Sequence, residues 1–196
     1  MQALVNHKVV KSLPLPEHSS FLYEYLFGSN GVFIRASRPG LEVLMPIETY
    51  QQPIKGLATI TPYLNLKAGK IPHHILRKIW IASYRAAPNE ILFHLRDTVD
   101  GWQLTIPPQT QTPTSCQPIS NVRNSSFADA LVEIHSHHEM PAFFSETDNA
   151  EETGFRLYSV LGQVTTDPEI RTRVGLYGYH WDIPSNLIYE PTNLRN

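Results

Sequence analysis

The sequence predicts an α/β fold: a mixed β-sheet flanked by helices, preceded by a β-rich N-terminal extension. Apolar residues make up 41% and charged residues 17% of the 196 positions, which is enough apolar material for a sizeable core. Sixteen prolines favour many strand and turn boundaries over a helical bundle. Only one long stretch, residues 72–86, has the apolar spacing of an amphipathic helix.

The first third of the chain is rich in β-prone residues separated by turn residues. Aromatic residues fill the segment 21–27, and Gly28-Ser29-Asn30-Gly31 supplies a turn before the next apolar run, which is typical of a hairpin. The strand-like segments are residues 21–27, 32–36, 41–47 and 57–66. We therefore expect residues 1–66 to form a β-rich extension and residues 67–196 to form a second domain.

The second part begins with the predicted helix. Pro72 suits a first helical position, where its missing N–H is not needed, and Pro88 favours an end just before it. Residues 107–126, rich in Pro, Thr, Gln and Ser, are expected to form a long polar loop. Strands are expected at residues 90–95, 101–106, 128–137, 155–164 and 173–179.

Charge and composition exclude several classes of partner. The formal net charge of −2 provides no basic excess for phosphates, so we expect no nucleic acid. No stretch approaches the roughly 20 apolar residues that span a bilayer, and residues 1–15 lack the apolar core of a signal peptide. Cys116 is the single cysteine, which suits a reducing cytoplasm. We expect a cytoplasmic protein without a membrane partner; its oligomeric state is open.

Candidate metal ligands gather in the segment 133–148. Side chains alternate in a strand, so His135 and His137 lie on one face, about 7 Å apart along it. Asp148 follows after a loop long enough to fold back. Two imidazoles and a carboxylate suit Zn²⁺ with an open fourth position, as in catalytic sites. Ser145 and Asp148 also have the spacing of a helix N-cap, and this alternative stays open.

The spacing His-x-His, seven residues, Ser-x-x-Asp resembles the JAMM (JAB/MPN-domain) metallopeptidase family over roughly residues 70–180. The resemblance implies a cytidine-deaminase-like core, zinc held by His135, His137 and Asp148, and stabilisation of the tetrahedral intermediate by Ser145. It also implies an acid/base glutamate just after the first helix, which Pro88-Asn89-Glu90 places at Glu90. The layout is also similar to the JAMM-type protein A of the bacterial PRTRC system.

Two departures from the family pattern concern the substrate groove. His138 stands where many members have proline, and the glycine-rich stretch that usually follows the glutamate is absent. Neither departure removes a ligand.

The resemblance implies hydrolysis of a peptide or isopeptide bond at the C-terminal tail of a ubiquitin-like or sulfur-carrier-like protein. One alternative is a non-catalytic MPN-type scaffold for protein assembly. A zinc deaminase is disfavoured because its His-x-Glu and Pro-Cys-x-x-Cys segments are absent. No covalent intermediate is needed, so Cys116 is expected to be incidental.

Overall fold

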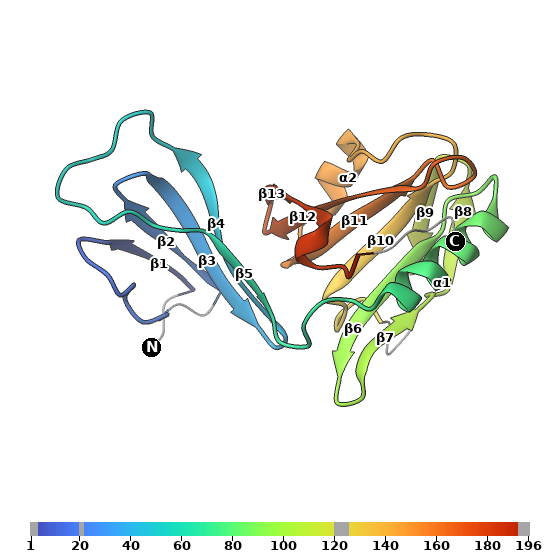
Figure 1. Cartoon of the computed structure of the whole chain (residues 1–196), viewed down its shortest axis with the longest axis horizontal. Helices are drawn as coiled ribbons and strands as arrows, with labels where there is room; N and C mark the ends of the chain where they lie inside the picture. The colour runs from blue at the N-terminus through green and yellow to red at the C-terminus, as the bar shows by residue number, and fades with distance from the viewer. Residues whose placement is uncertain (1–3, 20–21, 120–125, 192–196) are drawn as a thin grey trace. The chain divides into compact units, whose positions relative to one another are not determined.

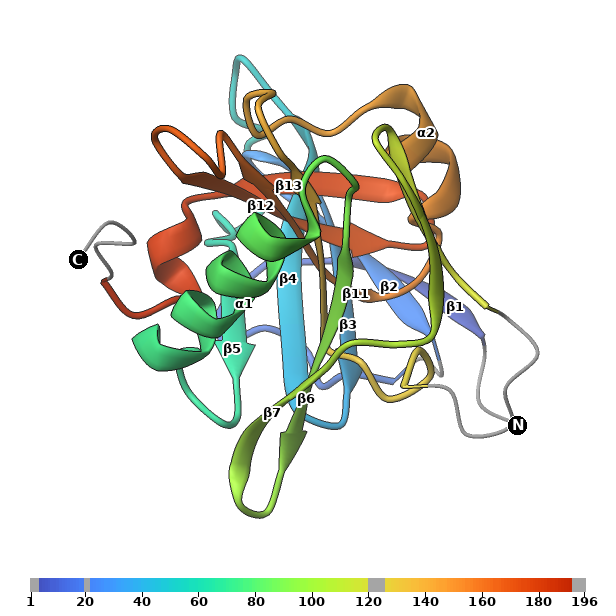
Figure 2. The same ribbon diagram turned by 90° about the vertical axis from the view of Figure 1, so that its right-hand side faces the viewer.

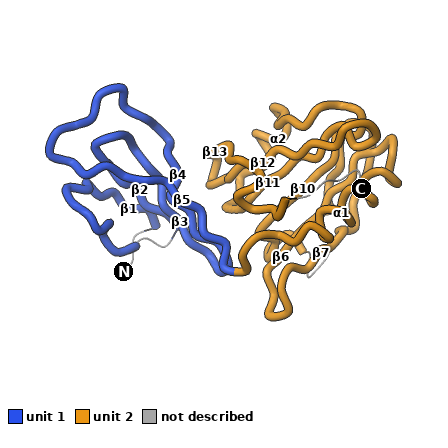
Figure 3. The backbone as a smooth tube through the Cα atoms, viewed as in Figure 1, with its two compact units in different colours: residues 1–67 blue, residues 68–196 orange. Residues whose placement is uncertain are grey.

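The computed structural model describes residues 4–19, 22–119 and 126–191. The chain divides into two compact units, residues 1–67 and residues 68–196 (Figures 1 and 3). The predicted fold class is confirmed, because strands in mixed sheets dominate both units and helices are few. Within the described ranges, no helix is both long and apolar enough to cross a bilayer.

The first unit is a five-stranded sheet in the order β1-β2-β3-β4-β5. Its strands are β1 (Val5–Val9), β2 (Tyr23–Gly28), β3 (Gly31–Arg38), β4 (Leu41–Thr49) and β5 (Tyr63–Leu66). β1 pairs with β2 in parallel, and the other pairs are antiparallel. One face of this sheet packs a small apolar core of Val10, Leu26, Phe33, Leu44 and Ile60.

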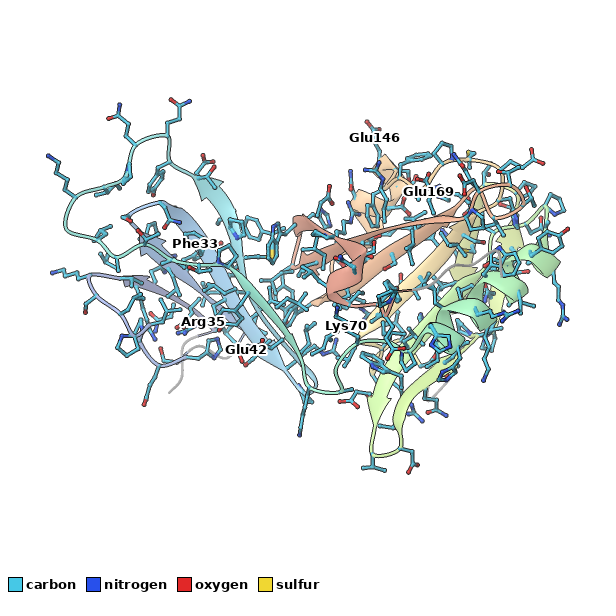
Figure 4. All side chains as sticks on the ribbon, viewed as in Figure 1. Phe33, Arg35, Glu42, Lys70, Glu146 and Glu169 are labelled. Atoms are coloured by element: carbon cyan, nitrogen blue, oxygen red, sulfur yellow. The ribbon has the colours of Figure 1, made fainter. Side chains whose placement is uncertain are left out.

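A buried charge cluster lies on that same face of the first unit. Glu24 and Arg35 are paired across β2 and β3, two residues along from Leu26 and Phe33 (Figure 4 labels Phe33 and Arg35). Arg35 Nε donates to Glu24 Oε1 at 2.7 Å, and Lys8 Nζ lies 3.0 Å from Glu24 Oε2. The two cations neutralise a carboxylate that is fully buried.

The second unit contains a six-stranded mixed sheet in the order β13-β12-β11-β10-β6-β7. Its strands are β6 (Leu92–Thr98), β7 (Gly101–Thr105), β10 (Val132–His137), β11 (Arg156–Gly162), β12 (Glu169–Leu176) and β13 (Tyr179–Ile183). β10 is central: it pairs antiparallel with β6 and parallel with β11. A 3₁₀ turn, Ser185–Leu187, follows β13.

Helix α1 (His73–Ala86) lies along this sheet (Figure 2). It buries Ile75, Leu76, Ile79 and Ser83, which recur at the three- and four-residue spacing of one helical face. The helix begins after Pro72 and ends before Pro88, as the sequence predicts. A shorter helix, α2 (Glu146–Glu151), follows β10, and Glu146 projects from it (Figure 4).

The predicted long loop at 107–126 is wrong in its first part. Two short strands, β8 (Gln109–Thr112) and β9 (Ser115–Pro118), form a hairpin there. The strand β8 consists of Gln and Thr alone. The side-chain amide of Gln109 bonds both backbone groups of Leu92: it donates to the carbonyl oxygen at 3.0 Å and accepts from the N–H at 2.7 Å. Residues 120–125 of the predicted loop lie outside the described residues.

Candidate active site

β10 carries two of the predicted ligands. His135 and His137 alternate with Ile134 and Ser136, which are buried on the other face. β10 runs antiparallel to β6, with His135 opposite Leu92. Two residues further along this register, His137 faces Glu90, which lies just before β6 begins. The antiparallel pairing therefore brings the predicted acid/base to the predicted ligands.

The structure brings His135, His137 and Asp148 together. One ligand atom from each lies within 4.8 Å of the others. The two Nε2 atoms are 3.2 Å apart, and His135 Nε2 is 3.5 Å from Asp148 Oδ1. Glu90 lies beside them, with its Oε1 3.8 Å from His137 Nε2. Four of the five predicted site residues thus converge on one point from β10, α2 and the segment just before β6.

Ser145 and Asp148 form a capping box at the start of α2, so the N-cap interpretation is confirmed. Asp148 Oδ2 accepts from the Ser145 backbone N–H at 2.6 Å and from its hydroxyl at 2.7 Å, while Ser145 Oγ accepts from the Asp148 N–H. The two interpretations of this pair are compatible, because the cap uses Oδ2 and the other oxygen, Oδ1, faces His135.

Helix α2 is also anchored at its C-terminal end. Arg173 on β12 donates to Glu152 Oε2 at 2.7 Å and to Asn149 Oδ1 at 2.6 Å. The Arg173 guanidinium also lies over the ring of Phe144, 3.9 Å from its centre. These contacts hold the short helix, and with it Asp148, against the sheet.

Both histidines are set up to be neutral. Burial lowers the pKa of His135 to about 4, although the nearby Asp148 carboxylate acts in the opposite direction. Burial also lowers the pKa of His137, although the Pro141 carbonyl favours its charged form. That carbonyl lies 3.4 Å from His137 Nδ1, so the proton resides on Nδ1 and leaves the lone pair on Nε2, toward His135.

The loop that carries the Pro141 carbonyl is held close to β11. Gln163 N–H donates to Met140 O at 2.8 Å, and Ala142 N–H donates to Glu169 Oε1 at 2.8 Å (Figure 4 labels Glu169). A Cβ at Gly162 would lie 2.1 Å from Ala142 N, so only glycine allows this close approach.

Glu90 is buried and carries a raised pKa. Burial, and secondarily the negative charge of Asp148, raise the pKa of Glu90 to about 7. A carboxyl group with such a pKa can both accept and release a proton near neutral pH.

The site opens into a cavity of about 280 Å³. Its lining includes Glu90, His135, His137, Ser145 and Asp148, with the β8–β9 hairpin along one side. On that side Gln117 Nε2 donates to Glu151 Oε1 at 3.1 Å, linking the hairpin to α2.

Cys116 and Glu133 are among the cavity residues that sequence reasoning missed. Cys116 belongs to β9 and lines the cavity, because the predicted loop is a hairpin. Glu133 also lines it and pairs with Arg156 Nη1 at 3.2 Å. The alternation that places His135 and His137 on one face would have found Glu133, two residues earlier on β10.

One comparison with known proteins identifies a family for this chain. The family model described as prokaryotic homologs of the JAB domain matches residues 72–174, more than half of the chain. The match identifies the family and does not assign the chain to a subgroup such as PRTRC protein A. No curated protein matches the chain significantly. The matched segment contains α1, Glu90, both histidines and Asp148. The chain belongs to the prokaryotic JAB-domain family.

Proposed function

We propose that this protein is a zinc-dependent peptidase or isopeptidase that cleaves at the C-terminal tail of a ubiquitin-like or sulfur-carrier-like protein. The observation that carries the proposal is the convergence of His135, His137 and Asp148 beside Glu90. A cytoplasmic location belongs to the same proposal.

The donor set and its spacing fit Zn²⁺. Ligands about 2.0–2.1 Å from a tetrahedral Zn²⁺ are about 3.3–3.4 Å apart. Two of the three spacings, 3.2 Å between the two Nε2 atoms and 3.5 Å between His135 Nε2 and Asp148 Oδ1, are close to this value, and the ligand atoms of His137 and Asp148 lie within 4.8 Å of each other. Two neutral imidazoles and one carboxylate would leave a fourth position open toward the cavity. When bound, zinc would supply Lewis acidity, polarising a carbonyl and acidifying water.

Glu90 would move the protons of the reaction. Its carboxylate, next to His137, would accept a proton from the attacking water and deliver it to the leaving amine. Its burial and raised pKa suit both steps, because the same group must release the proton that it takes up.

Ser145 would stabilise the developing oxyanion. Ser145 lines the cavity, but its hydroxyl donates to Asp148 Oδ2 in this structure. The proposed role therefore requires the hydroxyl to turn toward substrate, while its backbone N–H keeps the bond to Asp148. One well-placed donor of this kind is worth about 3–4 kcal/mol in comparable sites.

The strand residues that line the cavity support an extended peptide as substrate. The β8–β9 hairpin lies along one side, and residues of β10, of α2 and of the loop between them line the rest, together with Glu90 and Leu92. A strand such as β9 can offer backbone N–H and C=O groups to an extended tail. The prokaryotic JAB domain belongs to a family whose proteins act on ubiquitin-like partners, and this supports the choice of substrate.

The alternative, a non-catalytic scaffold, is less well supported. The cluster of two histidines and two carboxylates, of which His137 and Glu90 are buried, costs stability without a cation, since burial disfavours charge. Assembly alone gives no reason to retain such a cluster.

The test combines metal content with cleavage. Purified protein should hold about one zinc per chain, and fusions to ubiquitin-like proteins encoded beside its gene should be cleaved in a chelator-sensitive manner. His135→Ala and His137→Ala should lose zinc. Asp148→Asn is the matched variant at the third ligand, because its remaining oxygen can serve the cap while an amide NH₂ faces His135. Full zinc in the double variant His135→Ala/His137→Ala would contradict the assignment.

A further inference from the structure

The face of β10 opposite the ligands contacts the backbone that carries Glu90. Ser136 on β10 and His138, the residue directly after β10, alternate with His135 and His137, and both are buried. Continuing the register that pairs β10 with β6 beyond His135 and Leu92 places Ser136 opposite Ile91 and His138 opposite Asn89, so these residues bracket Glu90.

Each of the two residues makes hydrogen bonds to this segment. Ser136 Oγ accepts from the Ile91 N–H at 3.1 Å, and the Ser136 N–H donates to Ile91 O at 3.2 Å. His138 Nε2 donates to the carbonyl oxygen of Asn89. The backbone is therefore bonded on both sides of Glu90 by residues of the ligand-bearing strand.

The chemistry of the His138 bond defines its tautomer. A carbonyl oxygen only accepts, so Nε2 carries the proton. His138 Nδ1 is buried and has no hydrogen-bond partner among the described residues. An unsatisfied buried nitrogen is costly, so packing alone does not account for a histidine at this position.

Glu90 depends on its backbone for its position. In the described part of the chain, the side-chain nitrogen paired with its carboxylate is His137 Nε2, and at 3.8 Å it is beyond hydrogen-bond distance. The Glu90 N–H donates to Thr112 O at 2.8 Å, so the hairpin supplies a third anchor. Proline, which many family members have at the position of His138, offers no side-chain donor for the Asn89 carbonyl.

We propose that His138 is a positioning residue for Glu90: its Nε2–H holds the Asn89 carbonyl and keeps the Glu90 carboxylate aligned with the ligands on the opposite face of β10. This inference rests on the proposed function of Glu90 as acid/base. A displacement of about 1 Å can cost about a hundredfold in rate, so a single backbone hydrogen bond is enough to matter.

The experiment compares three variants of the full-length protein. His138→Gln keeps a donor that reaches about as far as Nε2, His138→Asn is one methylene shorter and falls short of Asn89, and His138→Leu removes the donor. His94→Leu is the control matched in burial, because His94 is also buried in this sheet but bonds Ser126 instead.

The first readout is amide hydrogen exchange of residues 89–91, which needs neither metal nor substrate. Exchange of the Glu90 and Ile91 amides should become at least about tenfold faster in His138→Asn and His138→Leu, because the segment opens more easily. His138→Gln should retain the wild-type rate, and His94→Leu should leave these two amides unchanged. If His138→Leu does not fold, the Gln and Asn variants still decide the question.

The second readout is the division between kcat and KM with zinc content measured alongside. In His138→Asn, kcat should fall about 10- to 100-fold with KM within about twofold and full zinc, and His138→Gln should restore it. Wild-type exchange at residues 89–91 in the Asn and Leu variants, or a Gln variant as impaired as Asn, would overturn the proposal. A zinc-loaded wild-type protein that cleaves nothing would count against the proposed function alone, since exchange still decides the contact.

Discussion

At the scale of single residues, the two carboxylate oxygens of Asp148 make different contacts. Oδ2 accepts both cap hydrogen bonds from Ser145, and Oδ1 faces His135. Sequence spacing alone suggested a cap and a ligand as competitors. The structure shows that a carboxylate at the third helical position satisfies the cap and still presents an oxygen to a neighbouring strand.

Glu90→Gln should separate metal binding from chemistry. The amide is nearly isosteric but cannot accept a proton, so kcat should fall at least about a hundredfold while zinc content and the melting temperature stay close to wild type. Cleavage kinetics and metal analysis on the same preparation would measure this. A variant that cleaves at the wild-type rate would mean that another residue is the base.

Glu24→Gln should change the acid sensitivity of the first unit. Burial alone would raise the pKa of Glu24, but hydrogen bonds from Arg35 and Lys8 outweigh it and leave the pKa lowered. With a lowered folded-state pKa, the ionised Glu24 carboxylate stabilises the folded unit fully at pH values above the unfolded-state pKa of about 4.5. This stabilisation is lost as the pH falls through the folded-state pKa.

The variant leaves Arg35 buried without its partner carboxylate, which costs about 3–5 kcal/mol near neutral pH for pairs of this kind. The difference in stability between wild type and Glu24→Gln should therefore shrink as pH is lowered from 7 to 3, measured by urea unfolding at each pH. A difference independent of pH would show that the Glu24 charge does not stabilise the fold.

At the scale of elements, the β8–β9 hairpin forms one side of the cavity. The side chain of Gln109 bonds this hairpin to the first residue of β6, Leu92. The Gln109 amide replaces a strand neighbour for Leu92, pairing with both of its backbone groups. The hairpin also receives the Glu90 N–H at Thr112 O. Its position and that of the proposed base are thus coupled.

Gln109→Ala should loosen this hairpin. Two backbone groups of Leu92 lose their partner, which should cost about 1–3 kcal/mol, and KM for a peptide substrate should rise more than kcat falls. Denaturant unfolding and steady-state kinetics would measure these effects. Thr110→Ala, at the neighbouring exposed position of the same strand, is the control. Equal effects of both variants would show that the loss of the Gln109–Leu92 hydrogen bonds is not the cause of the change in stability and KM.

The sequence predicts regular elements where periodicity is strong and fails where it is weak. Helix 72–86 was predicted almost to the residue because Pro72, Pro88 and the apolar spacing of Ile75 and Ile79 agree. The β8–β9 hairpin was missed because Gln and Thr show no alternation of polarity. Its stability comes from Gln109, whose partner Leu92 lies in another strand.

The sequence predicts the ligand residues of the candidate site more completely than it predicts the elements around them. Motif spacing brought His135, His137 and Asp148 into one hypothesis, and the structure places them together. The positions of Cys116 and Glu133 depend on the hairpin and on strand register, which are set by contacts distant in sequence.

At the scale of the whole molecule, the proposed chemistry belongs to one unit. All five proposed site residues lie within residues 68–196, and the first unit has its own sheet and apolar core. We propose that the first unit contributes to the choice of substrate or partner rather than to hydrolysis.

A truncated protein beginning at Ala68 should test this division. It should fold, bind about one zinc and retain slow, less selective cleavage, because the ligands and Glu90 remain within one unit. Circular dichroism, metal analysis and cleavage of a panel of fusions would measure these properties. An insoluble or molten product would show that residues 1–67 complete the core of the protein.

The six residues of α2 are far fewer than the roughly 12–15 that an isolated helix needs to persist in water. The helix therefore exists through its cap and through Arg173, and Asp148 belongs to both the cap and the ligand cluster. Because of this shared residue, any change that stabilises the helical state of α2 should increase the affinity of the cluster for a cation. By thermodynamic linkage, a bound cation should stabilise the helical state by the same free energy. The proposed affinity for zinc would therefore depend partly on how readily these six residues fold, and substitutions in α2 away from the ligand cluster should change it.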